Sequence, residues 1–139
     1  MTRTALAAAL LSAATAAGAA PDDAKGGYRL ETAGPAQTLQ VGETGKLAIA
    51  IHPEAPWHVD PRAPLSIRVE VPAGLSVGKS PLSRKDALDP KAEVPRFEIP
   101  VTAGAAGAQE ARAHLKFFLC RETICEQRTR TVAFPVTVR

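Results

Sequence analysis

Strict alternation of apolar and polar side chains is the feature of this 139-residue sequence that most limits its fold. The segment Leu65–Val71 has apolar residues at its odd positions and polar residues at its even positions. Residues 111–120 repeat the pattern, with Ala111, Ala113, Leu115, Phe117 and Leu119 on one side. Successive side chains of a β-strand point to opposite faces, so both segments are predicted to be strands with one buried face.

Shorter segments carry the same signal. Strands are predicted over residues 28–31, 38–41, 46–51, 75–77, 97–101 and 131–138. Glycine and proline turns separate these runs, and no segment beyond the N-terminal 20 or so residues keeps a helical period. The predicted fold class is therefore all-β, an immunoglobulin-like antiparallel β-sandwich.

The N-terminus is predicted to be a signal peptide. Arg3 precedes an alanine-rich apolar run, and the small residues Ala17 and Ala19 lie just ahead of Pro21. This order of a positive start, an apolar centre and a small-x-small site is typical of secretory signals. We expect cleavage near Ala19 and a periplasmic or secreted protein. No other run approaches the roughly 20 apolar residues of a spanning helix, so we expect no transmembrane segment in the mature chain.

The expected organisation is a signal peptide over 1–19, a leader with the first weak strands over 20–44, and a β-sandwich domain over 45–139. Lys and Arg number 17 against 14 Asp and Glu, and charges of both signs are interspersed. This mild excess does not support a nucleic-acid partner. The charged connection from residue 78 to 95 is long for a compact domain, so it is either a solvated loop or a functional one.

The two cysteines, Cys120 and Cys125, flank a predicted hairpin loop between the last two strands. In an exported protein an even cysteine count predicts a disulfide. Strand parity predicts that both sulfurs lie outside the core, on the face that carries Phe118 and Lys116. A ring of six residues stabilises the fold by only about 2 kcal/mol, and an exposed bridge is typical of labile disulfides. From the residues alone, a redox-active and a purely structural disulfide both remain open.

A metal site is a third interpretation, because His114, Cys120 and Cys125 share one face of the predicted strands and are soft ligands. However, His114 lies about 20 Å from Cys120 along an extended strand that rises roughly 3.3 Å per residue. His52 or His58 could approach the sulfurs only through the fold. We therefore expect no metal and no other cofactor.

Four motifs occur in order along the chain: Trp57-His58-Val59, the strand Leu65–Val71 with Pro72-Ala73-Gly74-Leu75, Phe97–Val101, and the hairpin Phe118–Cys125. Together they resemble the N-terminal periplasmic domain of the DsbD family of thiol:disulfide interchange proteins, over roughly residues 45–138. That domain is an immunoglobulin-like fold whose hairpin cysteines pass electrons to periplasmic disulfide proteins. The resemblance implies that Cys120 and Cys125 are a redox-active, catalytic pair.

The resemblance also implies a cap over the sulfurs. In the family, a loop shields the cysteines with aromatic and acidic side chains. The matching stretch, about 80–90, offers the carboxylates of Asp86 and Asp89 and the apolar side chain of Leu88, and Phe118 could add shielding. The family's membrane domain and thioredoxin-like domain are not in this sequence, so the implied electron donor is a separate membrane or thioredoxin-like protein.

Two functions follow from the sequence. The first is an exported thiol–disulfide exchange domain, an oxidoreductase that passes electrons to or from periplasmic thiol–disulfide proteins. The second is an immunoglobulin-like binding module whose disulfide is purely structural. A reduction potential below about −300 mV would indicate the second.

Overall fold

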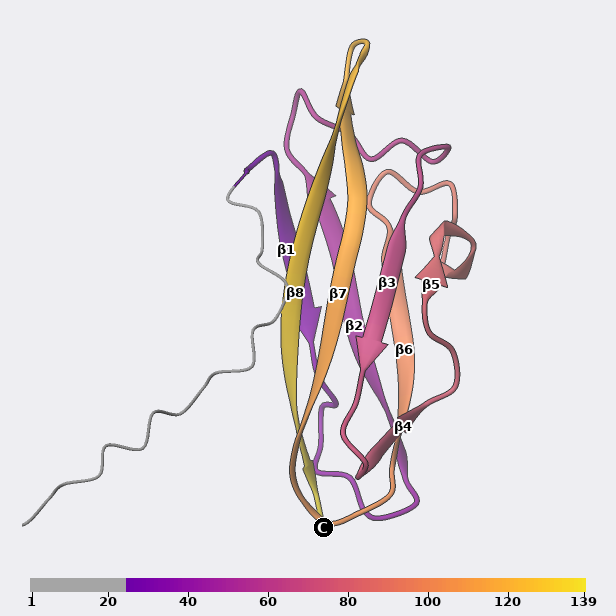
Figure 1. The fold of residues 1–139 in the computed structure, drawn as a ribbon, viewed down its shortest axis with the longest axis vertical. Coiled ribbons are helices and arrows are strands. Elements are labelled where there is room, and N and C mark those ends of the chain that lie inside the picture. The colour runs from indigo at the N-terminus through magenta and orange to yellow at the C-terminus, as the bar shows by residue number, and fades with distance from the viewer. Residues whose placement is uncertain (1–24) are drawn as a thin grey trace, which may run out of the picture.

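The structure, a computed structural model, describes residues 25–139, so the predicted signal peptide lies outside the described residues. Two antiparallel sheets of four strands lie face to face (Figure 1). The first sheet has the order β1 (Tyr28–Ala33), β2 (Thr44–Pro53), β6 (Arg96–Ala103) and β4 (Leu75–Val77). The second has the order β5 (Leu82–Ser83), β3 (Ser66–Glu70), β7 (Gly107–Arg121) and β8 (Ile124–Val138). A 3₁₀ turn, η1 (Arg84–Asp86), follows β5.

This strand order confirms the predicted all-β sandwich. The neighbours β1-β2-β6-β4 correspond to strands A-B-E-D of an immunoglobulin domain, and β3-β7-β8 correspond to C-F-G. Within residues 25–139, no helix has the length and apolar character needed to cross a membrane.

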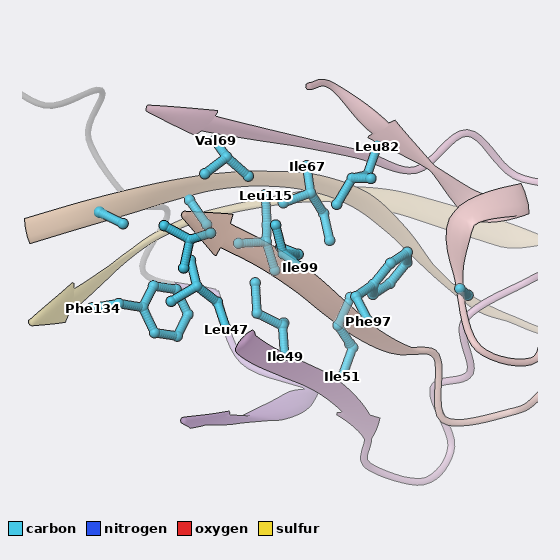
Figure 2. Close-up of a cluster of buried hydrophobic side chains, with 14 of the residues drawn as sticks. Leu47, Ile49, Ile51, Ile67, Val69, Leu82, Phe97, Ile99, Leu115 and Phe134 are labelled. Atoms are coloured by element: carbon cyan, nitrogen blue, oxygen red, sulfur yellow. The ribbon is translucent and has the colours of Figure 1, made fainter. Parts of the chain in front are cut away.

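The core lies between the two sheets and follows the alternation read from the sequence (Figure 2). The central strands bury every second side chain, including Leu47 and Ile49 of β2, Phe97 and Ile99 of β6, and Leu115 of β7. In β7, the five residues predicted to face inward are all exposed by 2% or less. Burial of the apolar face of each strand is therefore the main contribution that fixes the register of the strand.

The N-terminal part differs from the sequence-based prediction. Residues 38–41 are not a strand, because Leu39 alone forms a parallel bridge with Val138. The Leu39 amide donates to the Thr137 carbonyl at 2.9 Å, and the Arg139 amide donates to the Leu39 carbonyl at 2.8 Å. Since Leu39 is only 3% exposed, this short segment anchors the C-terminus of β8. The sandwich also extends upstream of residue 45, because β1 pairs with β2 along its whole length.

The β7–β8 hairpin positions the cysteines. Its two 15-residue strands pair from Gly107 and Val138 to Arg121 and Ile124. Glu122 and Thr123 form the turn, and its tip projects beyond the other strands at the end of the sandwich opposite the C-terminus (Figure 1). The cysteines therefore lie at the far end of the longest element of the fold.

Candidate functional site

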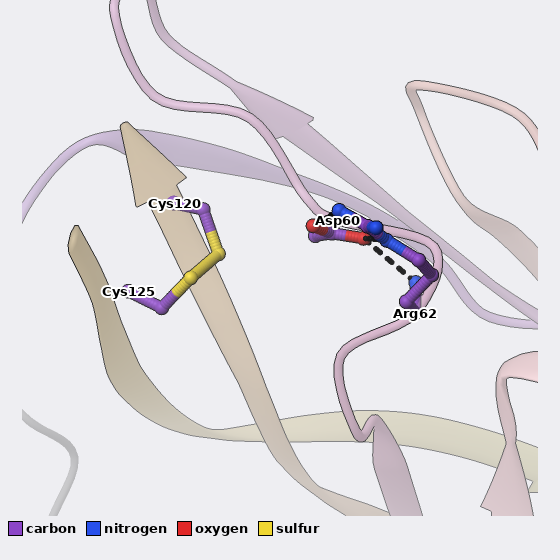
Figure 3. The surroundings of a disulfide bond; sticks show 4 residues. All are labelled: Asp60, Arg62, Cys120 and Cys125. Carbon is purple, nitrogen blue, oxygen red and sulfur yellow. Dashed lines mark hydrogen bonds and ion pairs between the residues drawn. A yellow bond between two sulfur atoms is a disulfide. The ribbon is translucent and has the colours of Figure 1, made fainter. Parts of the chain in front are cut away.

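The predicted disulfide is present at the tip of this hairpin. Cys120 near the end of β7 and Cys125 near the start of β8 are directly opposed, with a Cα–Cα distance of 4.0 Å (Figure 3). The sulfurs are joined at 2.08 Å. Two cysteines opposed in adjacent antiparallel strands have their side chains on the same face of the sheet, so the hairpin register itself brings the sulfurs together.

The two cysteines differ sharply in exposure. Cys120 is 3% exposed, whereas Cys125 is an exposed residue. The prediction that both sulfurs lie on an accessible face is therefore wrong for Cys120. The cause is the connection between β2 and β3, which runs over this end of β7 and pairs with it: the His58 amide donates to the Cys120 carbonyl at 2.9 Å, and the Cys120 amide donates to the His58 carbonyl at 2.8 Å.

Trp57 holds this connection against the hairpin. Two guanidinium groups lie over its ring, with Arg121 Cζ at 4.9 Å and Arg128 Cζ at 5.2 Å from the ring centroid. Arg128 is 3% exposed, and its Nε donates to the Gly26 carbonyl at 3.0 Å while Nη1 donates to Glu126 Oε2 at 3.0 Å. Cation–π contacts gain strength when they are shielded from water, so the contact with the buried Arg128 is the stronger one, while Arg121 is exposed.

The same connection continues to an ion pair that lies in the surroundings of the disulfide (Figure 3). Arg62 donates from its backbone amide to Asp60 Oδ1 at 2.8 Å and from Nη2 to Asp60 Oδ2 at 3.1 Å. The hydrogen bond from the Arg62 side chain is the main cause that holds the pKa of Asp60 below its ordinary value. The negative charge of Asp60, two residues after His58 on this connection, is thus compensated by the positive charge of Arg62.

The residues expected to cap the sulfurs lie in the connection between β4 and β6. Asp86 accepts from Lys79 Nζ at 2.6 Å and from the Ser83 amide at 2.8 Å, and these bonds lower its pKa. Asp89 accepts from the Lys91 amide at 3.0 Å. Leu88 is 61% exposed and lines a small groove on the outer face of β1, β2 and β6.

None of these contacts reaches either cysteine, so the cap role of Asp86, Leu88 and Asp89 stays a prediction. Phe118 is half-buried on β7, two residues before Cys120 and opposite Gln127. Of the residues singled out from the sequence, the hairpin brings together Cys120, Cys125 and Phe118.

His114 is engaged away from the sulfurs. Its Nδ1 lies 3.1 Å from Thr131 Oγ1, and its Nε2 lies 3.1 Å from Glu70 Oε2. In the part of the chain that the structure describes, no three or more His, Cys, Asp or Glu side chains are grouped so that they could hold a metal ion.

Three residues near the disulfide have roles that sequence reasoning missed. Trp57 was noted in the sequence only as part of a motif. Arg128 lies four residues before Val132 on the same side of the strand, and this position could have indicated that its guanidinium is buried. Ile124 also has the strand parity of Val132, yet it is 49% exposed. The hairpin tip extends past the end of the core, so an inward-facing position there has nothing to pack against.

Comparison with known proteins adds no family to this picture: no family model matches the chain, and no curated protein is significantly similar to it.

Proposed function

We propose that the protein is an exported thiol–disulfide exchange domain that acts through Cys120 and Cys125. The observation that carries the proposal is the unequal exposure of the two cysteines within one disulfide. Exchange needs one sulfur that an incoming thiolate can reach in line with the S–S bond. Cys125 is the exposed member of the pair and Cys120 is 3% exposed, so we assign the attack to the sulfur of Cys125.

The exchange step is a nucleophilic substitution. A thiolate of the partner protein attacks Sγ of Cys125, the Cys120–Cys125 bond breaks, and Sγ of Cys120 leaves as a thiolate. A second thiol of the partner then attacks the mixed disulfide and releases Cys125. The net result is that the pair gains two electrons and two protons while the partner's dithiol becomes a disulfide, and the reverse sequence passes electrons outward.

The position of the bridge supports exchange over a structural role. The 15-residue strands of the β7–β8 hairpin already hold the two cysteines in register. Closing the six-residue ring adds only about 2 kcal/mol by loop entropy, and less where the chain is already ordered. The disulfide therefore adds little stability to a hairpin that its backbone pairing already holds together.

The hairpin tip offers the partner a contact surface next to Cys125. Ile124 is 49% exposed and adjacent to the accessible cysteine, so it can bury apolar area against a docked protein. The expected partners are periplasmic thiol–disulfide proteins, with a membrane or thioredoxin-like protein as electron donor. An oxidising compartment outside the cytoplasm fits the disulfide and the predicted signal peptide.

Single-cysteine variants test the assignment of the attacked sulfur. Cys120→Ala leaves the thiol of Cys125, which we expect to react with a small aromatic disulfide at least about tenfold faster than the thiol of Cys120 in Cys125→Ala, because exposure controls access. The denatured variants serve as a control for intrinsic reactivity. Equal rates in the folded variants would contradict the assignment.

A redox titration separates exchange from the alternative, an immunoglobulin-like binding module with an inert disulfide. The oxidised fraction of the wild-type pair is followed by thiol trapping across a series of glutathione buffers. We expect a midpoint above about −300 mV, the range of labile and catalytic bridges. A lower midpoint would assign the bridge to the structural class and leave only the binding module.

A further inference from the structure

A groove lies between the segment that leads into β3 and the segment around η1. It has a volume of about 580 Å³ and is lined by residues 61–65 on one side and by residues 83–85, 90 and 91 on the other. Prolines and Leu65 supply much of its apolar wall. Its basic lining residues are Arg62, Arg84, Lys85 and Lys91. No acidic residue is among the described residues that line it, so the groove combines an apolar wall with positive charge.

Arg84 is the unusual member of this lining. It is only 8% exposed, and its guanidinium donates from Nε to the Pro90 carbonyl at 2.7 Å and from Nη2 to the Ala92 carbonyl at 2.6 Å. Nη1 is buried and has no hydrogen-bond partner among residues 25–139. Buried polar groups in native proteins are nearly always hydrogen-bonded, so this donor requires an explanation.

The charge of Arg84 is also incompletely compensated. Both of its hydrogen-bond acceptors are neutral carbonyl oxygens, and no carboxylate forms an ion pair with it in the described part of the chain. Burial is the main cause that lowers the pKa of Arg84, while the more distant charges of Asp89 and Asp60 oppose the shift. A buried cation without a bonded anion is costly, and an anionic ligand would relieve that cost.

The other basic residues differ in how free they are. Arg62 is committed to Asp60 by three hydrogen bonds. Lys85 and Lys91 are exposed, and within residues 25–139 neither side chain takes part in an ion pair. Arg84, Lys85 and Lys91 therefore remain to receive a negative group, with Arg84 providing the fixed donor.

We infer that this groove binds a carboxylate carried on a short apolar body. A volume of 580 Å³ falls within the range of small-molecule sites, which are mostly apolar with a few placed polar groups. Because Nη1 is covered in the structure, the η1 segment must shift before the carboxylate can accept from it, and the apolar body then lies on the proline-lined wall. Such a group can come from a free fatty acid or from a peptide C-terminus, and the site does not depend on the thiol exchange proposed above.

Amide chemical shifts of the full chain, followed by NMR at constant ionic strength, test the inference. The probes are hexanoate, N-acetyl-alanyl-leucine, hexanol and inorganic phosphate. We expect both carboxylates to shift the amides of residues 61–65 and 83–91 saturably, with hexanol and phosphate at least about tenfold weaker, because each lacks one half of the recognition. Tighter binding of the peptide or of hexanoate identifies the source. Absence of saturable shifts, or equal binding of hexanol, overturns the inference.

Variants locate the site. Arg84→Met should weaken binding of the carboxylates about tenfold, as expected for a hydrogen bond to a charged group. Arg84→Met also loses the hydrogen bonds to the Pro90 and Ala92 carbonyls, so a second variant is needed. The double variant Lys85→Gln/Lys91→Gln removes two charges from the groove without removing a described hydrogen bond of either side chain. It should weaken binding about threefold. Arg68→Gln, outside the groove, is the matched control. Unchanged affinity in both groove variants overturns the inference.

Discussion

His58 and Cys120 pair through their backbones although they are 62 positions apart in the sequence: each amide donates to the carbonyl of the other, at 2.9 and 2.8 Å. This isolated antiparallel bridge gives the end of β7 a neighbour on its second side. It explains why Cys120 is 3% exposed while Cys125, opposite it on the edge strand β8, is open to solvent.

Breaking the bridge should expose Cys120. We expect His58→Pro, combined with Cys125→Ala, to raise the rate at which iodoacetamide alkylates the Cys120 thiol about tenfold, because proline removes the donor and the segment opens locally. His58→Ala in the same background keeps the backbone donor and should change the rate less than about twofold. If both substitutions had the same effect, the bridge would not be what covers Cys120.

Gly27 packs against the Trp57 ring, so a side chain at this position would force a neighbouring group to shift. A Cβ at this position would lie 2.8 Å from Trp57 Cδ1, and Gly27 has a φ of +95°. Gly42 has a similar φ of +90° but nothing within 4 Å of its Cβ position. We expect Gly42→Ala to cost about 1 kcal/mol from backbone strain, and Gly27→Ala to cost roughly 1–3 kcal/mol more from the clash.

The two glycine variants are compared by the urea midpoint at constant m-value. Since the backbone strain is common to both, the difference between them reports the contact with Trp57. Equal losses of stability would show that Trp57 moves aside without cost.

Glu122 occupies a backbone conformation that suits glycine. Its φ is +50°, in the two-residue turn between the cysteines. A side chain in this region costs about 1–2 kcal/mol, partly offset in a glycine variant by roughly 0.5–1 kcal/mol of chain entropy. We expect Glu122→Gly to raise the thermal midpoint by a few degrees. Glu122→Ala, which keeps the Cβ, should give no gain, and a gain in both would point to the charge instead.

Acid should destabilise the fold through Asp60 and Asp86. Hydrogen bonds from Arg62 and Lys79, respectively, hold the pKa of each carboxyl below its ordinary value in the folded state. The unfolded state therefore takes up protons first, so the stabilisation is complete above about pH 5 and is lost as the pH falls through roughly 4 toward the folded pKa values.

Urea unfolding at a series of pH values measures this loss. The variant Asp60→Asn/Asp86→Asn should be less stable than the wild type at neutral pH but should lose less stability between about pH 5 and pH 2. An acid limb as steep as that of the wild type would show that other groups cause the loss.

The sandwich could be predicted from the sequence because its strands carry a period of two. Alternation located the inward faces of β3 and β7, and the same period predicted a strand over residues 131–138, which lie in β8. The disulfide followed from two cysteines flanking a hairpin. Each of these features depends on the order of residues within one continuous segment, so it can be predicted from that segment alone.

The cover over Cys120 could not be predicted in this way. The bridge between His58 and Cys120 uses only backbone atoms, so no side-chain pattern predicts it. It also joins two segments that are distant in the sequence. The contacts of Arg121 and Arg128 with the Trp57 ring likewise depend on how the connection between β2 and β3 folds back. For residues 38–41 the sequence predicted more structure than is present. The short segment was predicted to be a strand, but it forms only the single bridge between Leu39 and Val138.

The length of the β7–β8 hairpin has a consequence for the reduced protein. The two 15-residue strands are paired along their whole length in addition to the S–S bond, so we expect the thiols of Cys120 and Cys125 to stay opposed after reduction. Each thiol is then present at a high effective concentration for the other, and the reaction that closes the ring is intramolecular and preorganised. Under the proposed exchange function, the Cys120 thiolate would therefore displace a partner from a mixed disulfide with Cys125 quickly and restore the Cys120–Cys125 bond.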